Sequence, residues 1–219
     1  MDWGVDMKYG IGFISILLFL LFQNVAFAAN HAIEPQRALQ RLLEGNKRFM
    51  HDQSLCPNRN QDRRDATAAK QKPFAIVVGC SDSRVSPELT FDQGIGNIFV
   101  IRVAGNVVSA IELASVEYSA LHNNSVIVMV LGHEKCGAVD AVYHGKTRGI
   151  EPIARLIAPA VRKASHHKHT LSVAVKNNVQ NSVDRIKQSP IIQKLMKEGK
   201  IEVVGAYYHL RSGKVELID

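Results

Sequence analysis

The sequence predicts an α/β protein: a mainly parallel central sheet of four strands plus an edge strand, flanked by helices and preceded by an N-terminal helical arm. Three observations lead to this fold class. Short runs rich in valine and isoleucine recur along the chain. Segments with apolar residues at helical spacing lie between or after them. The short runs are apolar throughout, which is typical of parallel strands covered by helices on both faces.

Each element is predicted from its own pattern. The parallel strands are residues 74–79, 98–103, 125–131 and 201–207. Residues 214–218 follow a turn and are predicted to form an antiparallel edge strand. The helices are the arm at 34–50, a polar segment at 58–72 that combines a helix with a loop, and 109–122, 136–144, 151–164, 171–188 and 191–198. No repeat or second-domain boundary is visible, so residues 29–219 are predicted as one domain.

The first 28 residues are predicted to be a signal peptide. Residues 11–22 form an uncharged apolar run, shorter than the roughly 20 residues of a membrane span. A small-x-small pattern follows and places the cleavage after Ala28, so the mature chain is expected in the periplasm or outside the cell. The alternative is an uncleaved anchor. A start at Met7 instead of Met1 would give the leader a basic beginning with Lys8.

Charge and cysteine content narrow the function classes. The formal net charge is +7, but lysine and arginine are spread along the chain and no nucleic-acid motif accompanies them. We therefore expect no nucleic-acid partner and a basic surface that attracts small anions. The three cysteines cannot all pair within one chain, and metal binding is the best alternative use for two of them.

The polar residues that interrupt the apolar framework predict a metal site. Cys80 directly follows the first strand, and His133 follows the third strand after a single glycine. The carboxyl ends of parallel strands meet at one edge of the sheet, where ligands bind. Cys136 comes three residues after His133 and would lie beside it if it opens the next helix. Two thiolates and one imidazole form a catalytic zinc site with an open fourth position, where zinc lowers the pKa of bound water to about 7.

Asp82 and Arg84 follow the first ligand and complete the predicted chemistry. A carboxylate at this place could bind zinc itself or accept a proton from the zinc-bound hydroxide. An arginine beside it would hold that carboxylate ionised through charge-assisted hydrogen bonds and so choose between the two roles.

The segments CSDSR and HEKCG resemble the two signature motifs of the β-class carbonic anhydrases. The resemblance runs through nearly all of the mature chain and includes LLEGNKRF, IFVIRVAGN, SVEYSAL and IEVVGAYYHLRSGKVELI. It implies reversible hydration of carbon dioxide to bicarbonate and a proton, with one Zn²⁺ per chain held by Cys80, His133 and Cys136. It also implies that Asp82 and Arg84 act as the catalytic dyad and that the chain forms a homodimer or homotetramer.

The resemblance further implies a substrate pocket shared between subunits. Gln71 would hydrogen-bond substrate across the subunit interface, and an aromatic pair, Phe99 and Tyr118, would line the pocket. Gly137 would offer its backbone N–H to substrate. Ala104 and Gly105 would form the wall near the metal.

Two departures from the family pattern are visible. Members with a regulatory bicarbonate site have tryptophan where this chain has Val77, so we expect the plant-like, open form in which Asp82 pairs with Arg84. Closure by Asp82 onto zinc at low pH is left open. The second departure is Val103, where the family usually has asparagine.

Some features of the sequence also fit other functions. The nearest is a related zinc hydrolase of carbonyl sulfide or carbon disulfide, and another is a non-enzymatic zinc-binding protein of the periplasm. A thiol phosphatase would need more residues between Cys80 and Arg84. The two cysteines could instead form a disulfide. Cys56 is expected to be a free or intermolecular thiol. His166, His167 and His169 are expected to form a solvated surface patch, with proton buffering or stray metal binding as the alternative.

Overall fold

The computed structural model describes Met1 and residues 33–165 and 170–218. The predicted signal peptide with its cleavage after Ala28 and the histidine cluster at residues 166–169 lie outside the described residues. Residues 33–219 form one compact unit. Within the described ranges, no helix has the length and apolar character needed to cross a membrane.

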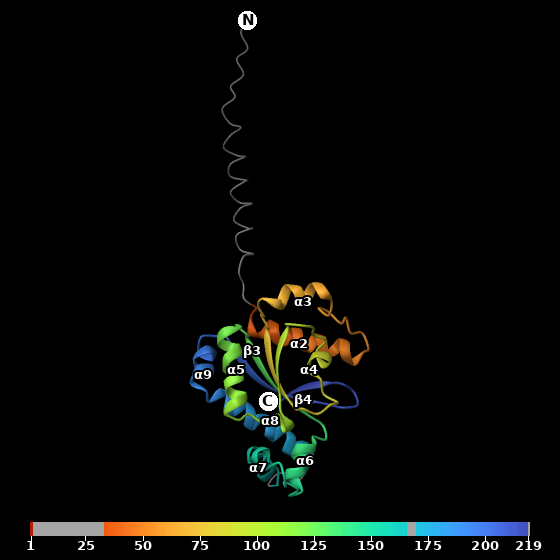
Figure 1. Cartoon of the computed structure of the whole chain (residues 1–219), viewed down its shortest axis with the longest axis vertical. Helices are drawn as coiled ribbons and strands as arrows, with labels where there is room; N and C mark the ends of the chain where they lie inside the picture. Colours follow the sequence, from red (N-terminus) through yellow and green to blue (C-terminus); the bar gives the residue numbers. More distant parts are fainter. Residues whose placement is uncertain (2–32, 166–169, 219) are drawn as a thin grey trace. The chain divides into compact units, whose positions relative to one another are not determined.

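A central sheet organises the described part of the chain, with five strands in the order β2-β1-β3-β4-β5 (Figure 1). The strands are β1 (Ala75–Gly79), β2 (Ile98–Arg102), β3 (Ile127–His133), β4 (Glu202–Tyr208) and β5 (Val215–Ile218). The first four are parallel, and β5 pairs antiparallel with β4. The predicted four parallel strands and antiparallel edge strand are therefore confirmed.

Helices cover both faces of the sheet. Successive side chains of a strand point to opposite faces, and because the residues of β1 and β3 are buried throughout, both faces are covered. Val77 packs in a core with α2 (Pro35–Met50). Its neighbours Ile76 and Val78 pack in a second core on the other face. The helices of that second face are α5 (Ala110–His122), α8 (Leu171–Lys187) and α9 (Pro190–Lys197). Further helices are α3 (Gln61–Ala68), α6 (Gly137–Tyr143) and α7 (Glu151–Ser165).

The N-terminal arm is fastened to the sheet by its helix α2. A side-chain carbon added at Gly45 would lie 1.8 Å from the carbonyl oxygen of Phe91, so only glycine permits this approach. Asn46 is buried and donates hydrogen bonds to the carbonyls of Thr90 and Gly213 at 3.2 and 2.7 Å. The arm predicted from its hydrophobic spacing is thus part of the core.

Three details differ from the predictions. The strand β2 forms one edge of the sheet, and four of its five residues are only half-buried, so it is not covered on both sides. A short helix α4 (Pro87–Thr90) follows the turn after β1 and was not predicted. A 3-10 turn, η2 (Ala104–Asn106), follows β2 and was not predicted.

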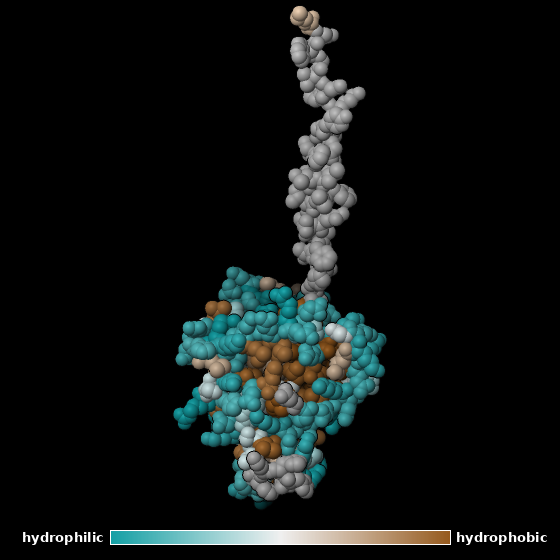
Figure 2. Space-filling view, turned by 180° about the vertical axis from the view of Figure 1, so that it is seen from behind, coloured by the Kyte–Doolittle hydropathy of each residue, from teal (hydrophilic) through white to brown (hydrophobic). Residues whose placement is uncertain are grey.

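Apolar surface is exposed in the described part of the chain. On α5, Ile111, Tyr118 and Leu121 are 74%, 50% and 48% exposed. Figure 2 shows hydrophobic side chains gathered in the middle of one face of the molecule, with hydrophilic side chains around them. Apolar patches of this kind usually mark contact surfaces.

Candidate metal centre

The three predicted zinc ligands come from two neighbouring strands and the helix that follows the second. The strands β1 and β3 are parallel and in register, with Gly79 opposite Leu131, so their carboxyl ends lie side by side. Cys80 follows β1 directly. His133 was expected to follow the third strand, but it is the last residue of β3. Cys136 was expected to open the next helix, and it is the N-cap of α6.

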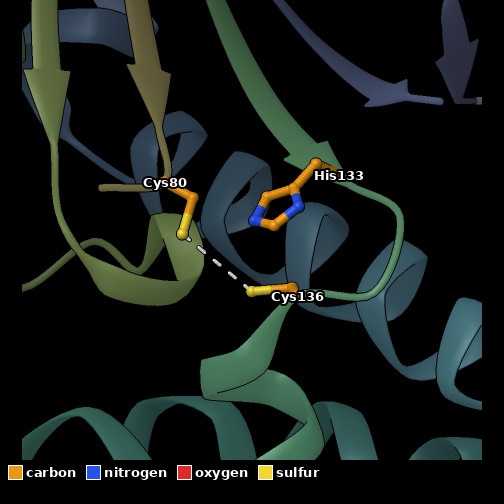
Figure 3. Close-up of side chains that lie close together, drawn as sticks. All are labelled: Cys80, His133 and Cys136. Atoms are coloured by element: carbon orange, nitrogen blue, oxygen red, sulfur yellow. Dashed lines mark hydrogen bonds between the residues drawn. The ribbon is translucent and has the colours of Figure 1, made fainter. Parts of the chain in front are cut away.

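The donor atoms converge as the sequence predicted. The ligand atoms of Cys80, His133 and Cys136 all lie within 4.8 Å of one another, and all three residues are buried (Figure 3). The two sulfur atoms are 4.0 Å apart. Two thiolates at zinc–sulfur bonds of about 2.3 Å in a tetrahedral site would be separated by about 3.8 Å. The alternative of a Cys80–Cys136 disulfide is wrong for this structure, because both thiols are free.

The histidine presents one specific nitrogen to the two sulfur atoms. Its Nδ1 lies 2.9 Å from the carbonyl oxygen of Glu134, an acceptor, so Nδ1 carries the proton and donates it. The Nε2 lone pair is then free, and Nε2 is buried with no hydrogen-bond partner among the described residues. A buried polar atom without a partner is costly unless something else binds it. A zinc ion fits this donor set because imidazole and thiolate are its usual ligands.

The sulfur atoms of Cys80 and Cys136 are close enough for one thiol to donate a hydrogen bond to the other. A hydrogen bond from Cys136 is the main cause that lowers the pKa of Cys80, and the hydrogen bond from the backbone N–H of Gly105 acts in the same direction. The pKa of Cys136 is raised, first by its hydrogen bond to Cys80 and then by burial. One cysteine is therefore poised as a thiolate, and metal binding must release the proton of the other.

Asp82 and Arg84 form the predicted pair. Arg84 donates from Nε to Oδ1 of Asp82 at 2.9 Å and from Nη2 to Oδ2 at 2.7 Å. The backbone N–H of Arg84 also donates to Oδ1 at 3.0 Å. The arginine side chain is the main reason that the pKa of Asp82 lies well below its usual range. Oδ2 of Asp82 lies 3.8 Å from Nε2 of His133, so the ionised carboxylate faces the donor cluster.

Arg102 holds the turn between the first ligand and the dyad, a role that the sequence reading missed. Its Nε donates to the carbonyl of Cys80 at 3.0 Å, and its Nη2 donates to the carbonyl of Asp82 at 2.7 Å. The sequence does contain a feature that could have indicated this role: Arg102 is a charged residue at the end of an otherwise apolar strand, at the edge of the sheet that carries the ligands.

The wall residues predicted near the metal lie in and beside η2. The backbone N–H of Gly105 donates to the sulfur of Cys80 at 3.2 Å. Ala104 precedes it in the same turn. Gly137 is the first residue of α6, and a side-chain carbon added there would meet no atom within 4 Å. The N–H of Gly137 is among the first four of α6, which have no partner within a helix.

The remaining pocket residues are not brought to the metal cluster within one chain. Phe99 and Tyr118 lie beside each other, with ring centroids 6.3 Å apart. Phe99 is paired with Ile76, four residues before Cys80, which corresponds to about 13 Å along the strand. Gln71 is exposed and lies before β1, at the end of that strand opposite to Cys80.

Cys56 lies outside the donor cluster. It is exposed and free, as expected of a cysteine that has no partner in the chain. Its backbone N–H donates to Asp92 at 2.9 Å. Cys56 therefore provides a matched control for the two cysteines of the centre.

Comparisons with known proteins agree with the geometry. Residues 75–215 match the family model described as carbonic anhydrase. A carbonic anhydrase of Mycolicibacterium smegmatis is 35% identical over 193 residues, covering 84% of this chain and 93% of the relative. Carbonic anhydrase 2 of Mycobacterium tuberculosis is 34% identical over the same length, with the same coverage.

Solved structures show the same similarity. A Coccomyxa β-carbonic anhydrase in complex with acetazolamide is 29% identical, with a TM-score of 0.65 and coverage of 82% of this chain and 86% of that chain. The β-carbonic anhydrase CcaA is 25% identical with a TM-score of 0.67, covering 83% of this chain and 95% of that chain. A tetrameric β-carbonic anhydrase of Sordaria macrospora, 19% identical with a TM-score of 0.60, shares the fold.

Proposed function

This chain belongs to the β-class carbonic anhydrases, and from that membership we propose a role for each residue of its centre and a site completed by a second subunit. The activity is the reversible hydration of carbon dioxide to bicarbonate and a proton, with zinc as the cofactor. The observation that carries the assignment is the buried Nε2 of His133, which has no partner among the described residues and faces two thiols 4.0 Å apart.

Cys80, His133 and Cys136 would hold the zinc ion. When bound, zinc supplies a Lewis acid that ionises water near neutral pH. The carbonyl of Glu134 keeps His133 in the tautomer that leaves Nε2 available. The thiolate of Cys80 is stabilised in advance by the N–H of Gly105, so the site is partly organised before metal enters.

Asp82 would accept and orient the proton of the nucleophile, and Arg84 would hold it in that role. Both carboxylate oxygens of Asp82 are engaged by Arg84. A carboxylate held in this way is ionised, and both of its oxygens are engaged by Arg84 instead of being free to bind the metal. This supports the open form. Gly137, whose N–H is at the start of α6, would donate to the substrate.

A second copy of the chain would complete the substrate pocket. The supporting observation is the apolar surface that runs from the half-buried edge strand β2 to the exposed face of α5, where Phe99 contacts Tyr118. An interface there would place Gln71 of one subunit near the centre of its partner. The assembly would be a homodimer or a homotetramer built from such dimers.

Subunit complementation tests this shared site. Gln71→Ala keeps the metal site and lacks the glutamine, whereas Cys136→Ala lacks the metal site and keeps the glutamine. Each variant alone should be nearly inactive. Random mixing of subunits should restore about one quarter of wild-type activity, because half of the dimers are mixed and one of their two sites is complete. No recovery in chains shown to exchange subunits would contradict the shared pocket.

Export would follow from the predicted signal peptide, residues 1–28. The mature chain would then begin at Ala29 and act in the periplasm or outside the cell. The mass of the mature protein recovered from a cell envelope extract tests the cleavage after Ala28, and the mass of the uncleaved precursor tests the start at Met1 or Met7. A full-length chain retained in the membrane fraction would support an uncleaved anchor instead.

Stopped-flow hydration of carbon dioxide, measured with metal analysis on the same samples, tests the activity. We expect about one zinc per chain and hydration by the wild type. Cys136→Ala should lose both, and the matched control Cys56→Ala should keep both, since Cys56 is exposed and outside the cluster. Bound zinc without hydration between pH 7 and 9 would contradict the assignment.

A further inference from the structure

The turn η2 supplies the hydrogen bond to the sulfur of Cys80, and its backbone is unusual. Gly105 and Asn106 both have positive φ angles, +76° and +45°. A non-glycine residue in this region is uncommon and costs energy, although asparagine tolerates it better than most residues. At Gly105 an added side-chain carbon would lie 2.8 Å from Ile157. The turn therefore needs outside contacts to keep this shape.

Two side chains of α8 provide those contacts. Nδ2 of Asn178 donates to the carbonyl of Gly105 at 2.6 Å. The hydroxyl of Ser182 donates to the carbonyl of Asn106 at 3.0 Å. The two residues are four positions apart, so they lie on the same face of the helix. Both are almost fully buried, at 1% and 4% exposure.

These contacts fix the orientation of the N–H that touches the metal ligand. The peptide units are planar and only φ and ψ are free, so a bond that holds the carbonyl of Gly105 restricts the ψ angle of the residue whose own N–H points at Cys80. Without Asn178 and Ser182 the two carbonyls would be buried without these donors, which is unfavourable. The turn would then relax, and the N–H would lose its aim at the sulfur.

We propose that Asn178 and Ser182 are positioning residues of the metal centre: from α8 they hold the Gly105 N–H on the sulfur of Cys80 and so strengthen zinc binding. This rests on zinc occupying the proposed site. A hydrogen bond to the thiolate stabilises its charged form and fixes the direction of the sulfur. Neither residue contacts the ligand cluster itself, and they lie 98 and 102 positions along the chain from Cys80 (178 − 80 and 182 − 80).

Zinc affinity of the full mature enzyme, measured by competition with a chromophoric chelator, is the first test. Asn178→Ala and Ser182→Ala should each weaken zinc binding about tenfold. Ser182→Thr keeps the hydroxyl and should restore affinity. The matched control is Asn177→Ala, because Asn177 lies on the same helix and also donates to a backbone carbonyl, that of Ala160 at 3.3 Å. It should leave zinc affinity unchanged.

A spectroscopic measurement separates positioning from general stability. In the cobalt-substituted enzyme, the sulfur-to-metal charge-transfer band should shift in Asn178→Ala and Ser182→Ala and stay in place in Asn177→Ala. Lower melting temperatures with wild-type affinity and spectrum would overturn the proposal. If Asn178→Ala does not fold, Ser182→Ala decides, because it removes a single oxygen. A wild type that binds no zinc would instead overturn the proposed function.

Discussion

Replacing Arg102 by alanine tests whether the turn between the first ligand and the dyad is held from β2. Arg102 donates to the carbonyls of Cys80 and Asp82 at 3.0 and 2.7 Å. Hydrogen bonds from a charged group contribute about 1.5–3 kcal/mol each, and solvent exposure places these at or below the low end. We expect Arg102→Ala to lower the free energy of unfolding by about 2 kcal/mol, or about 4–8 °C in melting temperature for a chain of this size.

The same substitution should weaken zinc binding about tenfold or more, because it frees the backbone that carries Cys80. Thermal unfolding by circular dichroism of the metal-free chain and chelator competition of the zinc enzyme measure the two effects. Arg102→Lys keeps the charge but has no planar fork to reach two carbonyls, so an intermediate loss is expected.

Arg155→Ala is the control for removing an exposed arginine. Arg155 lies on α7, outside the turn that carries Cys80 and Asp82, and it attracts the exposed Glu151 electrostatically. If Arg102→Ala matches this control in both melting temperature and zinc affinity, the clamp has no energetic role and the reasoning is refuted.

Three further outcomes follow from the structure. Asp82→Asn should keep its zinc and lose most hydration activity, because the amide cannot accept the proton. Metal analysis and stopped-flow rates measure the two properties, and full activity in the variant would show that Asp82 has no part in the reaction. Arg84→Gln should raise the pKa of Asp82, whose native value lies below its unfolded value. The stability that this pair contributes is therefore complete above about pH 4 and is lost as pH falls below it. The free energy of unfolding, measured with urea between pH 3 and 7, should differ most between wild type and variant at neutral pH, and the two values should converge at the acid end. A constant difference would contradict this. Gly45→Ala should destabilise the fold by ~3 kcal/mol, because the new carbon would lie 1.8 Å from the carbonyl of Phe91; an unchanged melting temperature would show that α2 can move away freely.

The sequence was sufficient for the fold class and for the ligand set, for local reasons. The period of apolar residues separates strands from helices, and apolar strands imply a covered parallel sheet. Once the sheet is parallel, Cys80 and His133 must lie at the same edge because each stands at the carboxyl end of a strand. Asp82 and Arg84 are two positions apart, so their pairing is also a local property.

Other features of the centre depend on packing between distant segments. The hydrogen bonds from Asn178 to Gly105 and from Ser182 to Asn106 join residues 73 and 76 positions apart, and no sequence period relates them. The clamp of Arg102 depends on β2 lying next to β1, a strand order that periodicity does not determine. The half-buried state of β2 was misjudged for the same reason, because an apolar strand has the same sequence pattern in the middle of a sheet and at an edge.

The sequence by itself therefore determined which residues can bind zinc and at which edge of the sheet they lie, because strand ends and residue spacing are read along the chain. Only the tertiary structure decided how those ligands are prepared: the proton on Nδ1 of His133, the N–H on the sulfur of Cys80, and the two α8 side chains behind it. These are directional contacts made across the fold. Their geometry depends on how helices pack on the sheet, which the order of residues does not state.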